Sequence, residues 1–278
     1  MKASAQMTGE YFGFEENQSV LLCLPANFIA GKMMLVRALT WRLKIDAIEP
    51  KLQLSVPNKN YYFAAMTPPQ IEGSFKSVSK IEKILLGGAP VSKTLESQLN
   101  SLNPLFFVSY GMTETLSHVA VRNIQEDEPN TYLGLSNVSF THHKENQLVI
   151  HAPNLLEEPL PTTDCVELIS KNKFRWLGRA DFVINSGGLK ISPEEIEGQI
   201  SSIVKNPFFV HGKEDSKWGM VPILIIESTP FDPRELLEEI QMHTSKNKAP
   251  KEVYFLDKFV LTQNGKLNRL ATFKSLKL

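Results

Sequence analysis

The first 125 residues alternate between two patterns of apolar side chains. Unbroken apolar runs at 19–24 and 81–86 are typical of strands that are buried on both faces. Residues 30–41 and 92–102 instead carry apolar side chains at helical spacing. Strands that alternate with amphipathic helices predict an α/β domain built around a sheet.

Between 133 and 178 the pattern changes to short strands separated by turn residues. Within this stretch, 165–170 and 174–177 are runs of strand-forming residues that flank the polar segment 171–173, which predicts a hairpin. We therefore expect a small β subdomain within the remainder of an N-terminal α/β domain, which covers 1–178.

A second unit begins after Gly178. Ser192, Pro193 and Glu195 open a helix, with Ser192 as the N-cap and Glu195 completing a capping box. The other expected elements are strands at 182–185, 188–191, 208–211, 221–227 and 252–256 and a helix at 232–243. This pattern predicts a C-terminal α+β domain at 179–278.

The chain has 278 residues, with 30 basic and 30 acidic side chains. That length exceeds one typical domain and agrees with two domains of unequal size. Balanced charge gives no overall field that would attract nucleic acid or an anionic membrane, so neither is expected as a partner. Any anionic ligand must be held by local groups.

Both cysteines, Cys23 and Cys165, lie in apolar stretches, where buried and reduced thiols are expected. The first residues lack the apolar core of a signal peptide, and no apolar run approaches the roughly 18 residues of a membrane span. We therefore expect a cytoplasmic protein. The six histidines have no spacing typical of zinc ligands, so no structural metal is assigned.

Two segments follow buried strands, where ligands collect in open α/β sheets. The first, Gly87-Gly88-Ala89-Pro90, would let the backbone approach a planar ligand such as a purine, although alone it is more often an ordinary turn. The second is Ser109-Tyr110-Gly111-Met112-Thr113-Glu114-Thr115. Its Thr113 hydroxyl suits a phosphate and its Glu114 carboxylate suits Mg²⁺, unless Thr113 is only a helix cap.

Three further motifs carry charge. Asp164, after Thr163, is suited to gripping two ribose hydroxyls, with Arg179 nearby, whereas a surface salt bridge with Asp181 is the alternative. Lysines end or follow glycine turns in Asn185-Ser186-Gly187-Gly188-Leu189-Lys190 and Asn264-Gly265-Lys266-Leu267-Asn268-Arg269. Such a lysine can stabilise an oxyanion or a phosphate, but each turn alone is more often solvated.

Taken in order, these motifs, with Gly178-Arg179-Ala180-Asp181 and Pro193-Glu194-Glu195-Ile196-Glu197, resemble the adenylate-forming superfamily of acyl-CoA synthetases, luciferases and adenylation domains. The resemblance covers nearly the whole chain. It implies an ATP-dependent acid–thiol ligase, in which a carboxylate attacks the α-phosphate of ATP and coenzyme A later displaces AMP. The adenylate is needed because a carboxylate is a poor electrophile.

The resemblance also implies roles for individual residues. It assigns nucleotide binding to Gly87, Gly88, Ala89, Pro90, Tyr110, Gly111, Thr113, Asp164 and Arg179, Mg²⁺ binding to Glu114, and the substrate pocket to Asn27, Ser109 and Thr115. Lys266, Thr113 and Lys190 are the catalytic candidates, and Lys266 would stabilise the transition state of adenylation. Asp181 would be the hinge of a mobile C-terminal domain, and Gly187 and Gly188 would form a loop that replaces Lys266 for thioester formation.

Among members of the superfamily, 24–34 and 109–115 look most like the o-succinylbenzoate–CoA ligases of menaquinone synthesis. The chain departs from common patterns at Thr163, where many relatives have glycine, and at Asn27 and Phe28, where many have a histidine.

The loop that cradles the β- and γ-phosphates of ATP is expected ahead of residue 1, so early sheet strands would also be missing. Sheet edges left open in this way predict poor solubility or pairing with a second copy of the chain. A ligase for another aryl or fatty acid is one alternative, and a truncated adenylate-binding protein without catalysis is the other.

Overall fold

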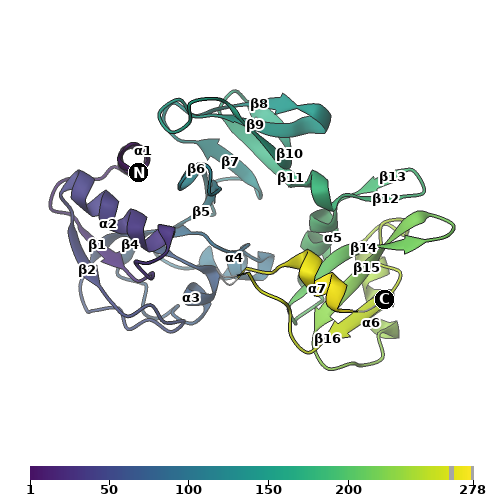
Figure 1. Ribbon diagram of the computed structural model, residues 1–278. Coiled ribbons are helices and arrows are strands. Elements are labelled where there is room, and N and C mark those ends of the chain that lie inside the picture. The colour runs from purple at the N-terminus through teal and green to yellow at the C-terminus, as the bar shows by residue number, and fades with distance from the viewer. Residues whose placement is uncertain (263–265, 277–278) are drawn as a thin grey trace. The chain divides into compact units, whose positions relative to one another are not determined.

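The structure is a computed structural model that describes residues 1–262 and 266–276 (Figure 1). Two compact units are distinguished by their internal contacts. The first contains Met1–Val91, Leu95–Thr162 and Val166–Trp176, and the second contains Ser92–Thr94, Thr163–Cys165 and Leu177–Leu278. The domain boundary at 178, which the sequence pattern predicts, stays a prediction.

A sheet of 11 strands organises the first unit. Its parallel part contains β1 (Ser19–Leu22), β2 (Lys44–Ala47), β3 (Tyr61–Met66), β4 (Ile81–Leu86) and β5 (Leu105–Gly111) in the order β2-β1-β3-β4-β5. The sheet continues through β6 (His118–Asn123), β7 (Thr131–Gly134), β11 (Lys173–Arg179), β10 (Leu160–Ser170), β9 (Gln147–His151) and β8 (Ser139–His143). The strands of the expected β subdomain therefore extend the α/β sheet rather than forming a separate one.

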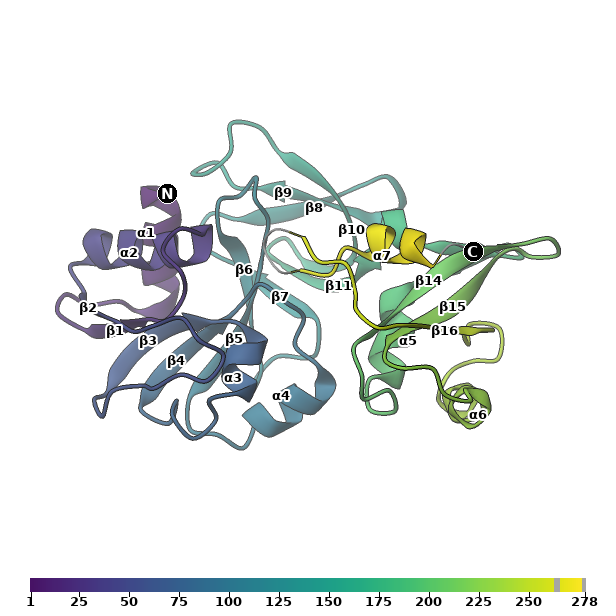
Figure 2. The ribbon, with the colours of Figure 1, turned by 60° about the horizontal axis from the view of Figure 1, so that its bottom comes forward.

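Helices cover both faces of the parallel strands (Figure 2). The helices of this unit are α1 (Lys2–Phe12), α2 (Ile29–Trp41), α3 (Pro68–Glu72) and α4 (Lys93–Leu99), with a short 3₁₀ turn η1 (Lys144–Asn146). Because side chains alternate across a strand, Val20 of β1 packs in the core under α1 and α2, whereas Leu21 packs in the core under α3 and α4. This double burial explains the unbroken apolar runs in the sequence.

The second unit is built on a sheet of five strands. Its elements are η2 (Ala180–Phe182), β12 (Ile184–Ser186), β13 (Leu189–Ile191), α5 (Pro193–Ile200), β14 (Phe208–Asp215), β15 (Gly219–Glu227), α6 (Arg234–His243), β16 (Val253–Leu256) and α7 (Arg269–Ser275). The strand order is β13-β12-β15-β14, and β16 runs parallel to β15. Separate cores lie on its two faces, one around Ile196 and Leu224 and the other around Phe209 and Ile225.

The predicted hairpin and helix N-cap are present in the structure, but the predicted capping box is not. The hairpin is confirmed as β10 and β11, and the N-cap is confirmed because the Ser192 hydroxyl accepts a hydrogen bond from the Glu195 amide at 3.3 Å. The capping box is wrong, because the Glu195 carboxylate pairs with Lys248 Nζ at 2.9 Å instead. The short ion pair to Lys248 outcompetes the backbone amide of the cap.

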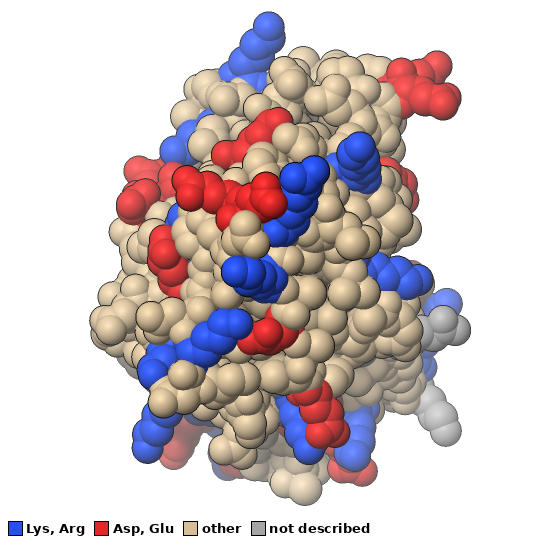
Figure 3. Space-filling view, turned by 90° about the vertical axis from the view of Figure 1, so that its left-hand side faces the viewer, with Lys and Arg blue, Asp and Glu red and all other residues tan. Residues whose placement is uncertain are grey.

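Charge is mixed at the surface. On the face drawn in Figure 3, basic and acidic side chains of the described residues lie among one another. This distribution agrees with the equal numbers of the two charge types in the sequence. Among the described residues, no helix has the length and apolar character that a membrane span requires.

Candidate functional site

The glycine turn after β4 lies beside the C-terminal end of β5. Ser109 Oγ donates a hydrogen bond to the carbonyl oxygen of Leu86 at 2.8 Å. A Cβ atom placed on Gly87 would stand 2.7 Å from that same Ser109 oxygen, so the turn needs glycine to come this close. Since β4 and β5 are parallel neighbours, their carboxyl ends bring the two predicted motifs to one edge of the sheet.

Close backbone approach also defines the end of β5 and the start of the loop that follows it. The pairing of β5 with β6 shifts register between Tyr110 and Gly111. A Cβ atom on Gly111 would lie 2.4 Å from the carbonyl oxygen of Ser117, which no side chain tolerates without movement of the backbone. The Tyr110 ring packs on Tyr132 and Phe174, with centroids 5.5 and 5.0 Å away, so its position is fixed by the sheet.

The buried side chain of Thr115 stabilises the turn after β5 through hydrogen bonds to the backbone. The residue is fully buried, and its Oγ1 lies 2.7 Å from the Ser117 carbonyl oxygen and accepts from the Met112 amide at 3.0 Å. Thr113 and Glu114 are left exposed by this arrangement. Thr115 thus shapes the loop, and its place in a substrate pocket stays a prediction.

Other predicted residues of the first unit are solvent-accessible. Gly88 has φ +86°, in the left-handed region, and Ala89 and Pro90 after it are exposed. Asn27 is exposed in the segment that joins β1 to α2. Their positions leave these residues open to a ligand, while their assigned roles stay predictions.

Arg37 and His118 form a buried polar cluster that the sequence reasoning missed. Arg37 Nη2 lies 3.1 Å from Ser117 Oγ and 3.5 Å from His118 Nδ1. Both side chains are at most 5% exposed. A signal was present, because Arg37 interrupts the apolar run Met33-Met34-Leu35-Val36 in a helix that packs on the sheet.

No carboxylate of the described residues pairs with Arg37. Burial lowers the pKa of Arg37 to about 10, so the guanidinium still carries its charge at neutral pH. Burial, followed by the charge of Arg37, holds the pKa of His118 well below its ordinary value of 6.5. The cluster therefore carries one uncompensated positive charge inside the protein.

Two polar atoms of the cluster have no hydrogen-bond partner within the described residues, namely Arg37 Nε and His118 Nε2. A guanidinium can only donate, so Arg37 Nε is an unused donor, whereas His118 Nδ1 lies 3.2 Å from Ser117 Oγ and 3.5 Å from Arg37 Nη2 and can accept or donate according to the tautomer of the ring. An unused donor beside an uncompensated cation is the chemistry that a carboxylate satisfies.

Asp164, Arg179 and Asp181 lie in the second unit. Arg179 pairs with Asp181, with Nη2 and Oδ2 2.8 Å apart, as the surface alternative predicted. Burial raises the pKa of Asp181, but the hydrogen bonds of Arg179 and Thr163 outweigh it, and the net pKa is lowered. Asp164 is 7% exposed, and its charge contributes to the raised pKa of Arg179. The structure thus brings all four residues of this motif together.

The glycine turn before Lys190 is the tip of the β12–β13 hairpin. Gly187 and Gly188 have φ +56° and +85°, which favour glycine. A Cβ on Gly187 would stand 2.5 Å from the Trp218 ring, and the Gly187 amide donates to the Trp218 carbonyl oxygen at 2.8 Å. Lys190 is exposed beside this turn.

Lys266 is exposed at the start of the segment that leads into α7. Its amide donates to Thr262 Oγ1 at 3.1 Å, and its carbonyl oxygen accepts from the Thr262 amide at 2.7 Å. Asn264 and Gly265 of the same motif lie outside the described residues.

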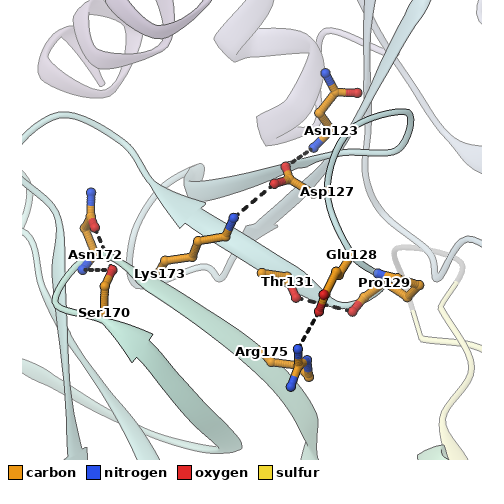
Figure 4. A network of polar contacts seen from close by, with 9 residues as sticks. All are labelled: Asn123, Asp127, Glu128, Pro129, Thr131, Ser170, Asn172, Lys173 and Arg175. Carbon is orange, nitrogen blue, oxygen red and sulfur yellow. Dashed lines mark hydrogen bonds and ion pairs between the residues drawn. The ribbon is translucent and has the colours of Figure 1, made fainter.

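A polar network fixes the β10–β11 hairpin to the β6–β7 connection (Figure 4). Asp127 accepts from Lys173 Nζ at 3.2 Å and from the Asn123 amide at 2.9 Å. Arg175 of β11 pairs with Glu128 at 2.5 Å. These contacts are structural, because each charge has a partner within the network.

The described residues contain no group of three or more His, Cys, Asp or Glu side chains placed to hold a metal ion. A Mg²⁺ ion that travels with a nucleotide needs only one or two carboxylates and takes its other ligands from phosphates and water. The exposed Glu114 carboxylate fits that lesser requirement.

Comparisons with known proteins bear on the fold and the family of the chain. No family model matches the chain. An AMP-forming acyl-CoA synthetase/AMP-acid ligase II-like protein from Dyadobacter fermentans is 34% identical with a TM-score of 0.63, over 99% of this chain and 83% of that one. A 2-succinylbenzoate–CoA ligase from Staphylococcus epidermidis is 27% identical over 96% of this chain and 63% of the relative.

The fold is also shared with the o-succinylbenzoate CoA synthetase of Bacillus subtilis, solved with its acyl-adenylate, at a TM-score of 0.85 and 22% identity, over 96% of this chain and 63% of that one. The architecture is thus that of the adenylate-forming proteins. On the similarity to the Dyadobacter protein, the chain belongs to the AMP-forming acyl-CoA synthetases of that superfamily. It spans 63% of the length of the Staphylococcus ligase.

Proposed function

We propose that the protein takes part in activating a carboxylic acid with ATP and transferring the acyl group to coenzyme A. In the first step a carboxylate oxygen attacks the α-phosphorus, and the bond to pyrophosphate breaks. In the second step the sulfur of coenzyme A attacks the acyl carbon, the bond to AMP breaks, and the thiol proton is released. Membership of the family supports this chemistry.

Each predicted role has chemistry that supports it. The Gly87 turn and the Tyr110 ring offer a backbone edge and an aromatic surface to adenine. The exposed Thr113 and Glu114 are available to the α-phosphate and to Mg²⁺. Lys266 is an exposed cation for the charge that develops on the phosphate oxygens.

In this proposal, residues of the second unit bind the ribose and carry out the second half-reaction. Asp164 and Arg179 supply a carboxylate and a guanidinium for the ribose hydroxyls. The β12–β13 tip with Lys190 would serve thioester formation, with Asp181 as the hinge between half-reactions.

For the acid, we propose o-succinylbenzoate, and the observation that carries this choice is the unpaired charge of Arg37. An acid activated as its adenylate loses one carboxylate charge, but a dicarboxylic acid keeps a second one that needs a counter-charge. Arg37 supplies a buried cation beside the loop after β5, with an unused donor at Arg37 Nε and an unpartnered ring nitrogen at His118 Nε2. A fatty acid or a simple aryl acid offers no group that would use this charge.

The test is calorimetric titration of the chain with a non-hydrolysable o-succinylbenzoyl-adenylate analogue, beside its benzoyl and fatty-acyl counterparts. An acyl-adenylate has no β- or γ-phosphate, so binding tests the described site directly. We expect the o-succinylbenzoyl analogue to bind most tightly. Asp164→Ala should weaken all three analogues, because they share the ribose.

Arg37→Met separates the acid from the nucleotide. A charge-assisted hydrogen bond contributes about 1.5–3 kcal/mol, so this variant should lose roughly tenfold to a hundredfold affinity for the o-succinylbenzoyl analogue alone. An equal loss of affinity for the benzoyl analogue would overturn the assignment of o-succinylbenzoate as the substrate. No binding of any analogue to the folded wild type would overturn the ligase itself in favour of a non-catalytic protein.

A further inference from the structure

Arg269 and Glu197 form a paired contact at the start of α7. Arg269 Nη1 and Nη2 lie 2.7 Å from Glu197 Oε1 and Oε2, respectively, so both oxygens of the carboxylate are engaged. The two side chains are 18% and 17% exposed. Glu197 Oε1 also accepts from the Val210 amide at 2.8 Å, which joins α5, β14 and α7 at one carboxylate.

Aromatic rings hold the same guanidinium. The Cζ atom of Arg269 lies 5.2 Å from the ring centre of Phe182 and 5.7 Å from that of Phe209. The Phe182 ring is also 5.5 Å from Cζ of Arg179. Phe182 belongs to η2 and directly follows Asp181, so Arg269 is tied to the segment that carries the proposed hinge.

The Lys266 segment is attached to α7 by short contacts. The Asn268 amide donates to the Val260 carbonyl oxygen at 2.9 Å, and the Val260 amide donates to Thr272 Oγ1 at 3.0 Å. Between these contacts and Lys266, a bridge joins Leu261 to Leu267. The backbone at Lys266 therefore follows the position of α7.

Stability alone is a weak explanation for this ion pair. Burial raises the pKa of Glu197 even though the charge and hydrogen bonds of Arg269 lower it, so removing the carboxylate from water is costly. Buried ion pairs are often no more stable than apolar replacements, and their best-attested value is to fix one geometry. The geometry fixed here is the start of α7, three residues after Lys266.

We propose that Arg269 and Glu197 are positioning residues for Lys266. They hold residues 266–268, which carry the lysine into α7, in register with α5 and with the hinge segment through Phe182. The inference rests on the proposed function, because it assigns Lys266 the work of adenylation. Its physical content, that the pair orders residues 266–268, is independent of the reaction.

Glu197→Gln tests the proposal against Glu195→Gln, a matched change two residues away that breaks the exposed pair with Lys248. Arg269→Lys is a second variant, which keeps the charge but cannot engage both carboxylate oxygens. The first readout is hydrogen exchange at the Val260 and Asn268 amides, with melting curves as the control for folding. We expect faster exchange at these amides in Glu197→Gln and Arg269→Lys, and wild-type exchange in Glu195→Gln.

The second readout separates the two half-reactions in the full-length protein. Adenylation should slow by about tenfold to a hundredfold in Glu197→Gln and Arg269→Lys, since a displacement near 1 Å costs that much, while thioester formation from preformed adenylate is unchanged. Wild-type exchange at Val260 and Asn268 in Glu197→Gln, or equal slowing of both half-reactions, would refute the positioning role. A wild type that forms no adenylate would refute the proposed function instead, and the exchange data would still decide whether the pair orders residues 266–268.

Discussion

The Nη2 atom of Arg37 lies 3.5 Å from Nδ1 of His118, with both side chains buried between α2 and β6. Two groups that both become cationic are a costly pair away from water, and the protein accommodates them by keeping the histidine neutral. Sites that cost stability in this way are often maintained for binding or catalysis. The pair thus predicts a conflict between stability and ligand affinity.

Replacing Arg37 should make the protein more stable. Arg37→Met removes a buried charge that has no counter-charge among the residues the structure describes, and we expect the free energy of unfolding to rise by about 1–4 kcal/mol. Arg122→Met is the matched control, because Arg122 is equally buried but pairs with Glu96. That variant strands a carboxylate and should lose up to about 3 kcal/mol. Urea denaturation measures both, and the same sign in both variants would contradict the argument.

Stability should fall below neutral pH because of His118. Its folded-state pKa is lowered far below 6.5, so as pH falls through 6.5 the unfolded chain binds a proton that the folded protein refuses. The free energy of unfolding should then drop by about 1.4 kcal/mol per pH unit from this group. His118→Gln should reduce the measured slope to the part that comes from His211, whose pKa is also lowered by burial, whereas His243→Gln, at an exposed histidine, should keep the wild-type slope. Urea unfolding at pH 7.5, 6.5 and 5.5 is the measurement.

Lys266→Ala tests whether Lys266 acts in adenylation and not in thioester formation. In the full-length form, adenylation should slow severely, because the developing charge on the phosphate loses its cation. Thioester formation from preformed adenylate should remain largely intact, because the proposal gives that step to the β12–β13 loop. Pyrophosphate exchange and thioester assays measure the two steps separately. An equal loss in both steps would rule out domain alternation.

The edge of the sheet could be predicted from sequence, since the buried apolar runs end at Leu86 and Val108, although β5 itself continues to Gly111. Two parallel neighbouring strands must deliver their loops to one side, and the order of the motifs identified the superfamily. The prediction that the two loops share one edge depends on the order of strands and glycines along the chain, which can be read directly from the sequence. The hairpin of β10 and β11 was predictable for the same reason.

The Arg37 cluster could not be predicted in this way. A sequence displays the arginine, but what matters is that no carboxylate of the described residues pairs with it, and that depends on the packing of α2 against β6. The failed capping box has a similar cause, because Glu195 is drawn to Lys248, 53 residues later in the chain. Partners that are distant in sequence decide what a charged side chain does.

Replacement by alanine should have opposite effects on stability at Gly111 and at Gly198. At Gly111, a methyl group would meet the Ser117 carbonyl 2.4 Å away, so Gly111→Ala must displace the loop after β5. We expect a loss of about 1–3 kcal/mol in stability, together with weaker binding of every acyl-adenylate analogue.

Gly198 lies inside α5, and a Cβ there would meet nothing within 4 Å. Gly198→Ala should therefore stabilise the second unit by about 0.5–1 kcal/mol and leave analogue binding unchanged, because alanine restricts the unfolded chain at no steric cost. Thermal melts and calorimetry on the two variants would show opposite shifts in stability, and wild-type binding by Gly111→Ala would mean that this loop does not shape the adenylate site.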